Sequence, residues 1–133
     1  MYIPLNKIYI DEVEGKGLGV FALMPIKKDE LIEICPLMSL GKTPNNKHQD
    51  PFFHYRFAYP KEGRHNGHED QVVAWGYGSL YNHSNNPNAD WKDHPTEKVF
   101  QFIAMQDIEK GEEITIHYGG DSYWRKRKEI NLI

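Results

Sequence analysis

The apolar residues of this chain fall in short runs that glycine and proline interrupt, and this pattern constrains the fold more than any other feature. Runs with strand character cover Lys7–Asp11, Gly19–Met24, Glu30–Met38, Lys98–Met105 and Glu113–Tyr118. Short apolar or alternating runs bounded by turn residues are typical of β-strands, whereas helices need longer stretches with a period of about 3.6 residues. We therefore expect a mainly β fold.

Helical signals are weak along the whole chain. We expect a short aromatic helix over Pro51–Tyr59 and a second helix over Ser122–Ile130. No stretch has the composition of a linker between domains, and a length of 133 residues is typical of one domain. Residues 1–133 are therefore predicted to form a single domain.

Two segments of the chain echo each other in sequence. Ile26–Ile34 and Ile108–Ile116 each contain a polar turn that leads into a strand. Two explanations stay open, namely an internal duplication and the same turn chemistry used twice.

Charge and cysteine content exclude several functions. The 16 Lys and Arg residues and the 19 Asp and Glu residues give a net charge of −3, which argues against direct binding to nucleic acid phosphates. Cys35 is the only cysteine, so an intrachain disulfide and a cysteine-rich zinc site are excluded. We find neither a signal peptide nor an apolar run that could span a membrane, so we expect an intracellular protein, cytoplasmic or nuclear.

The seven histidines raise the question of a metal site. His65 and His68 share a glycine-containing loop, but no nearby cysteine or acidic pair completes a ligand set. We therefore expect no metal. A metal-dependent hydrolase that uses these histidines is kept as the weakest of three functional hypotheses.

Three separated segments carry the main functional signal, and they are Gly15–Ala22, Tyr81–Asn88 and Gly111–Gly119. In this order, and in a chain of this size, they resemble the SET domain of protein lysine methyltransferases. Each motif is weak alone, but the three together in the family's order are specific. The chain resembles in particular the minimal viral and bacterial members, which lack zinc-binding flanking domains.

The resemblance implies a SET-domain fold with several small curved sheets, short helices and a C-terminal segment threaded under a loop. It also implies protein-lysine N-methyltransferase activity with S-adenosyl-L-methionine as the methyl donor. The substrate would be a basic, lysine-containing segment of a histone or another protein, bound in extended form by a mildly acidic chain. A homodimer is left open.

The matched motifs also imply roles for individual residues. Tyr118 takes the catalytic position, next to the methyl group that is transferred. The residues implied in cofactor binding are Lys16, Gly17, Leu18, Gly19, Asn82, His83, Tyr118 and Trp124. The residues implied in the lysine channel are Tyr55, Tyr77 and Trp91. Core packing is the alternative role for Trp124 and Tyr55.

Methyl transfer from a sulfonium to an amine suits a site rich in tyrosine. The reaction is a direct displacement, so alignment of the two partners supplies much of the rate. Tyrosine hydroxyls and backbone carbonyls orient the amine and contact the polarised methyl group through weak C–H···O bonds. The 8 Tyr and 3 Trp residues of this chain can provide such a site.

Three positions depart from the family pattern. Ser79 stands where many relatives have arginine, His117 where aspartate is common, and Asn85 where cysteine is common. An imidazole in place of a carboxylate makes the local charge depend on pH. These departures motivate an alternative function, a non-enzymatic module of the same fold that binds a peptide or a partner protein.

Overall fold

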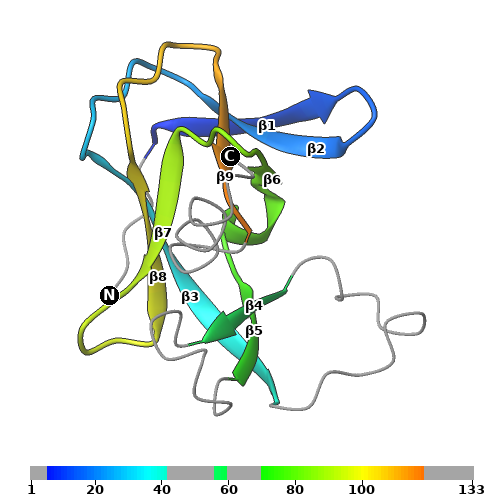
Figure 1. Cartoon of the computed structure of the whole chain (residues 1–133), viewed down its shortest axis with the longest axis vertical. Helices are drawn as coiled ribbons and strands as arrows, with labels where there is room; N and C mark the ends of the chain where they lie inside the picture. The colour runs from blue at the N-terminus through cyan, green and yellow to red at the C-terminus, as the bar shows by residue number, and fades with distance from the viewer. Residues whose placement is uncertain (1–5, 42–55, 60–69, 119–133) are drawn as a thin grey trace, which may run out of the picture.

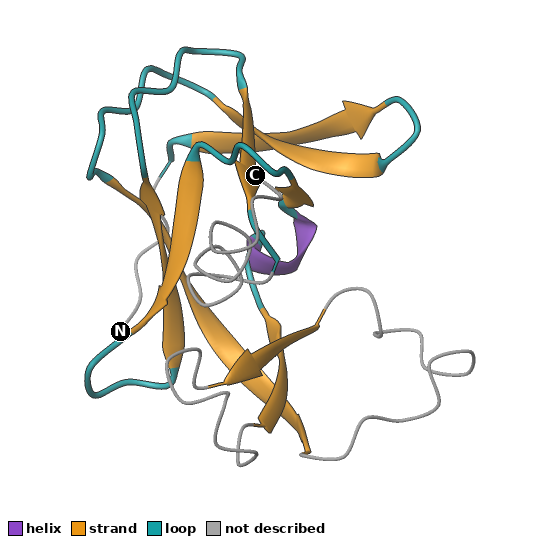
Figure 2. Cartoon of the chain, viewed as in Figure 1, coloured by secondary structure: helices purple, strands orange, loops and turns teal. Residues whose placement is uncertain are grey.

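The computed structural model describes residues 6–41, 56–59 and 70–118, and strands dominate this part of the chain (Figure 2). The strands are β1 (Ile8–Val13), β2 (Gly17–Ala22), β3 (Leu31–Gly41), β4 (Arg56–Tyr59), β5 (Asp70–Ala74), β6 (Asn82–His83), β7 (Ala89–Asp93), β8 (Val99–Ala104) and β9 (Glu113–Ile116). A short 3₁₀ helix, η2 (Gly78–Leu80), precedes β6. Within these three ranges, no helix is long and apolar enough to cross a membrane.

A four-stranded sheet brings together the three segments that the sequence singles out. Its strand order is β1-β2-β9-β6, and the β1–β2 hairpin projects at one end of the molecule (Figure 1). β6 and β9 pair in parallel, with Asn82 opposite Thr115 and His83 opposite Ile116. This pairing places the start of β6 beside the last residues before Tyr118.

A five-stranded antiparallel sheet, in the order β4-β5-β3-β8-β7, carries the aromatic part of the core. The ring of Phe100 lies 5.3 Å from that of Phe57 and 4.8 Å from that of Trp91. The ring of Tyr81 stacks on Phe102 at 4.5 Å. Each such aromatic pair contributes about 0.5–1.5 kcal/mol beyond the burial of its area.

The structure confirms the prediction of a mainly β fold, and β1, β2, β3, β8 and β9 correspond to the five predicted runs. The helix predicted over Pro51–Tyr59 is wrong for Arg56–Tyr59, which forms β4 and pairs with β5. Phe57 and Tyr59 alternate toward the core in this strand, and pairing across the sheet overrides local helical preference. The other residues of that predicted helix lie outside the described residues, as do the helix predicted over Ser122–Ile130 and the threaded C-terminal segment.

The two segments that echo each other in sequence contact each other in the structure. Ile26 and Ile108 exchange backbone hydrogen bonds of 2.9 and 2.7 Å. Each turn then places one residue at positive φ, Asp29 at 71° and Gly111 at 84°. In each turn, the glutamate that follows accepts a hydrogen bond from a backbone N–H three residues earlier. The same residue pattern therefore builds one turn geometry twice.

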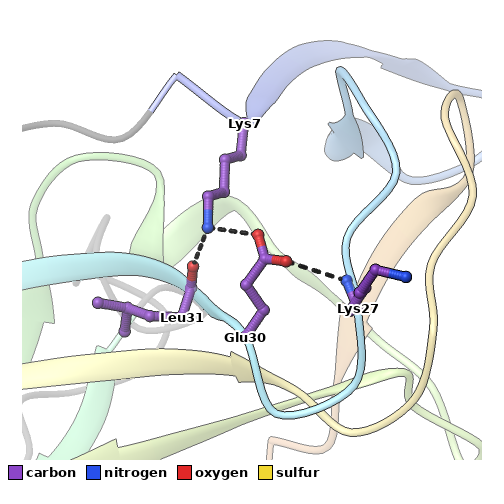
Figure 3. A network of polar contacts seen from close by, with 4 residues as sticks. All are labelled: Lys7, Lys27, Glu30 and Leu31. Carbon is purple, nitrogen blue, oxygen red and sulfur yellow. Dashed lines mark hydrogen bonds and ion pairs between the residues drawn. The ribbon is translucent and has the colours of Figure 1, made fainter.

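A polar network links the residue before β1 to the start of β3, and so joins the two sheets at the surface (Figure 3). The Lys7 ammonium forms an ion pair with the Glu30 carboxylate and donates a 2.9 Å hydrogen bond to the Leu31 carbonyl. The other Glu30 oxygen accepts a 3.2 Å hydrogen bond from the Lys27 backbone N–H. The hydrogen bond from Lys7, followed by that from Lys27, lowers the pKa of Glu30.

Candidate active site

Tyr118 follows β9 and lies at the centre of the candidate site. It is 50% exposed, and its hydroxyl donates a 3.0 Å hydrogen bond to the Tyr81 carbonyl. Its backbone N–H donates a 3.1 Å hydrogen bond to Nδ1 of His83. Tyr118 is therefore held both at its backbone and at its hydroxyl, while half of the residue stays exposed.

His83 is oriented by two hydrogen bonds on opposite sides of its ring. Because Nδ1 accepts the Tyr118 N–H, the ring proton lies on Nε2. Nε2 lies 3.1 Å from Oδ1 of Asn85, which accepts that hydrogen bond. Asn85, one of the departures from the family pattern, thus keeps His83 in the orientation that holds the backbone of Tyr118.

Asn82 ties three strands of the four-stranded sheet together. Its side-chain amide donates a 2.7 Å hydrogen bond to Oε2 of Glu113 on β9 and a 3.2 Å hydrogen bond to the Leu18 carbonyl on β2. Asn82 therefore fixes β2 and β9, the strand that leads to Tyr118, relative to β6 at the edge of the sheet.

The glycines at the start of β2 have different physical requirements. A Cβ atom on Gly19 would lie 2.7 Å from Oε2 of Glu113 and 2.7 Å from Cγ2 of Val13, which is too close for any real contact. At Gly17, no described atom lies within 4 Å of the Cβ position, but φ is +83°, which favours glycine. Gly19 therefore permits close packing beneath the loop, whereas Gly17 permits its turn and leaves bare backbone facing open space.

Asn88 fixes the backbone of the candidate site, although the sequence motifs assigned it no role. It is 5% exposed, its amide donates a 2.8 Å hydrogen bond to the Glu113 carbonyl, and its Oδ1 accepts a 2.9 Å bond from the Thr115 N–H. It thereby fixes the backbone of β9 just ahead of Tyr118. Its position at the end of the Tyr81–Asn88 motif was the available signal, because a buried asparagine must find hydrogen-bond partners.

His117, the residue before Tyr118, and Trp91 on β7 are both buried. His117 is 3% exposed, and its ring lies 4.5 Å from that of His83. Trp91 is 1% exposed, and its indole N–H donates a 3.1 Å hydrogen bond to the His117 carbonyl. The structure thus places Trp91 in the core, where it supports the backbone that leads into Tyr118.

The remaining predicted residues fall in different places. Lys16 is exposed in the β1–β2 turn, and its N–H donates a 3.0 Å hydrogen bond to the Val13 carbonyl. Tyr77 is half-buried ahead of η2 and packs against the core. Ser79 accepts a 3.1 Å hydrogen bond from the Ala74 N–H, so its hydroxyl closes the turn after β5. Tyr55 and Trp124 lie outside the described residues.

Acidic, histidine and cysteine side chains do not gather into a metal site in the part of the chain that the structure describes. His65 and His68, on which the hydrolase hypothesis depends, lie outside that part.

The segments that meet around Tyr118 belong to a known family. Residues 17–119 match the family model described as SET domain. The chain therefore belongs to the SET domain family, here in its protein-lysine methyltransferase form.

Relatives with this domain are known from several organisms. The chain is 33% identical over 127 residues to a Schizosaccharomyces pombe protein named histone-lysine N-methyltransferase, H3 lysine-37 specific, a match that covers 93% of this chain and 82% of that protein. It is 30% identical over 136 residues to the Mycosarcoma maydis histone-lysine N-methyltransferase, H3 lysine-36 specific, covering 91% of this chain but 13% of that longer protein. The resemblance to minimal viral and bacterial members stays a prediction.

A solved structure supports the same assignment. The fold is similar to the crystal structure of a candidate histone methyltransferase from Plasmodium falciparum, with a TM-score of 0.69 and 35% identity. The match covers 90% of this chain and 98% of that chain.

SET-domain methyltransferases use S-adenosyl-L-methionine, and the residues present here fit that cofactor. A Cβ position at Gly17 faces open space, and Tyr118 is half-exposed, so both positions are accessible to a ligand. Backbone groups of Gly17 and Leu18, together with Asn82 and His83, are the groups that would hold it.

Proposed function

We propose that this chain transfers a methyl group from S-adenosyl-L-methionine to a lysine side chain of histone H3. The observation that carries the proposal is the arrangement of Tyr118, whose hydroxyl is fixed by the Tyr81 carbonyl while half of the residue is exposed. Two relatives are named for their action on lysines of histone H3. The net charge of −3 favours a basic substrate segment of this kind.

The residues of the chain act on the reaction by positioning. S-adenosyl-L-methionine, when bound, supplies an activated methyl group for displacement by an amine. Because the Tyr118 proton is committed to the Tyr81 carbonyl, lone pairs of the phenol oxygen can accept a hydrogen bond from the lysine amine and orient it. His83 holds Tyr118 and Asn82 holds β2. Alignment of the amine with the methyl group then supplies much of the rate.

The proposal extends to residues whose roles rest on the family resemblance. Tyr77, Tyr55 and Trp91 are proposed to form or support the lysine channel, and Trp124 to stack on the adenine of the cofactor. Exposure of Tyr118 to solvent leaves a route by which the amine can lose its proton before it reacts.

The test incubates the purified chain with methyl-labelled S-adenosyl-L-methionine and recombinant histone H3, and locates the label by mass spectrometry. Tyr118→Phe keeps the ring and removes the hydroxyl, so we expect transfer to fall by about 10²- to 10³-fold. Equal transfer by the wild-type chain and the variant contradicts the role of Tyr118. Binding of H3 by a wild-type chain that transfers no methyl group supports the non-enzymatic alternative.

A histone substrate also implies a nuclear location. Fluorescence microscopy of the tagged full chain tests this, and exclusion from the nucleus favours another basic protein as the substrate. A homodimer stays a prediction, which sedimentation of the purified chain tests.

A further inference from the structure

A half-buried carboxylate, Glu33 on β3, lies beneath the Gly76–Gly78 turn and holds two tyrosine residues. Its Oε2 accepts a 2.9 Å hydrogen bond from the Tyr77 backbone N–H, and its Oε1 accepts a 2.7 Å hydrogen bond from the Tyr81 hydroxyl. A Cβ atom on Gly76 would lie 2.6 Å from Oε2 of Glu33. The glycine therefore lets the turn close directly onto the carboxylate.

Tyr81 connects this carboxylate to the candidate site. Its side chain is 1% exposed, is stacked on Phe102 and ends in the hydroxyl that Glu33 accepts. Its backbone carbonyl accepts the 3.0 Å hydrogen bond from the Tyr118 hydroxyl. Two hydrogen bonds and one residue thus separate Glu33 from the catalytic phenol.

We propose that Glu33 is a positioning residue for methyl transfer, which orients the Tyr118 hydroxyl through Tyr81 and sets the turn that carries Tyr77. The inference rests on the proposed function, and it assigns to Glu33 no contact with substrate or cofactor. Burial raises the pKa of Glu33, and the hydrogen bonds from Tyr77, Tyr81 and the Cys35 thiol oppose that effect. A carboxylate at this place is costly to bury, and these donors offset part of that cost.

The test combines Glu33→Gln with Tyr81→Phe, which removes only the hydroxyl and keeps the ring stacked on Phe102. Each single variant is expected to lower kcat by about 10- to 100-fold, because a small displacement of a reacting group costs this much. KM for the H3 substrate is expected to stay within about twofold, since ground-state binding is left intact. The double variant is expected to lose no more than the worse single variant, because both substitutions break one connection.

Glu97→Gln, in the exposed turn between β7 and β8, is the matched control and is expected to leave kcat unchanged. The ¹³Cζ resonance of the Tyr118 ring, assigned by its loss in Tyr118→Phe, gives a second readout that needs no catalysis. We expect it to move in Glu33→Gln and in Tyr81→Phe and to stay in Glu97→Gln.

Two results separate the failures. A wild-type chain that transfers no methyl group contradicts the proposed function, and the Tyr118 resonance then still decides the role of Glu33. Additive losses in the double variant, or unchanged kcat and an unmoved resonance in Glu33→Gln, overturn the inference while the proposed function stands.

Discussion

The two sheets of this molecule are stabilised in different ways. The five-stranded sheet is held by buried aromatic rings, among them Phe57, Trp91 and Phe100, which contact one another at 4.8 to 5.3 Å. The four-stranded sheet ends at β6, a strand of two residues, and the side-chain amides of Asn82 and Asn88 fix the neighbouring strand β9. The five-stranded sheet therefore contributes most of the stability, whereas the hydrogen bonds of the four-stranded sheet fix the geometry of the candidate site.

Truncation of the aromatic core is expected to give the largest loss of stability. Phe100→Ala removes a fully buried ring and leaves a cavity, so the free energy of unfolding is expected to fall by about 3–5 kcal/mol. Phe21→Ala in the other sheet, where the ring is half-buried against Tyr9, is expected to cost less than half of that. Urea unfolding of both variants compares the two losses, and equal losses would contradict the larger contribution of the five-stranded sheet to stability.

Loss of the buried amide is expected to damage the site as well as the fold. Asn88→Ala leaves the Glu113 carbonyl and the Thr115 N–H without their partner, so stability is expected to fall by about 2–3 kcal/mol. Methyl transfer is expected to fall further than this loss of folded protein explains, because β9 carries Tyr118. Asn86→Ala, an exposed neighbour, serves as the control. Full activity in folded Asn88→Ala would contradict a positioning role for the polar network.

Two alanine variants separate the effects of side-chain crowding and of backbone strain at the start of β2. Gly19→Ala forces its Cβ against Val13 and Glu113, and since the carboxylate can rotate away in part, we expect a loss of about 1–2 kcal/mol with weaker binding of S-adenosyl-L-methionine. Gly17→Ala meets no crowding but strains a positive φ, at about 1 kcal/mol. Calorimetric titration with the cofactor and thermal unfolding measure the two effects. If Gly17→Ala lowers the free energy of unfolding more than Gly19→Ala does, close packing at Gly19 is not what fixes the start of β2.

The sequence allowed prediction of those strands and site residues that local patterns encode. Five apolar runs were enough to predict five strands, and the order of three motifs was enough to predict that Asn82, His83 and Tyr118 lie close together. β6 could not be predicted, because two residues carry no periodicity and the strand exists through its pairing with β9.

Contacts between distant residues were equally invisible in the sequence. The hydrogen bond from Tyr81 to Glu33 joins residues 48 positions apart, and nothing in either local sequence specifies it. The residues of β4 were predicted to be helical because the local sequence does not show their pairing with β5, and this pairing makes them a strand. The channel role of Trp91 rests on motif order and stays a prediction, but the burial of its side chain in β7 could not be read from the local sequence.

The smallest effect is expected at the surface junction of the two sheets, where Lys7 contacts Glu30 (Figure 3). Because the pKa of Glu30 is lowered from 4.5 in the folded chain, the pair stabilises the fold above that pH and loses its effect as pH falls through the lowered value. Both side chains are partly exposed, so Glu30→Gln is expected to cost less than about 1 kcal/mol at pH 7. Urea unfolding at several pH values tests the sign: the difference between wild type and variant should shrink toward acid and in high salt. A difference that grows toward acid would mean that the junction is held by the uncharged form of Glu30.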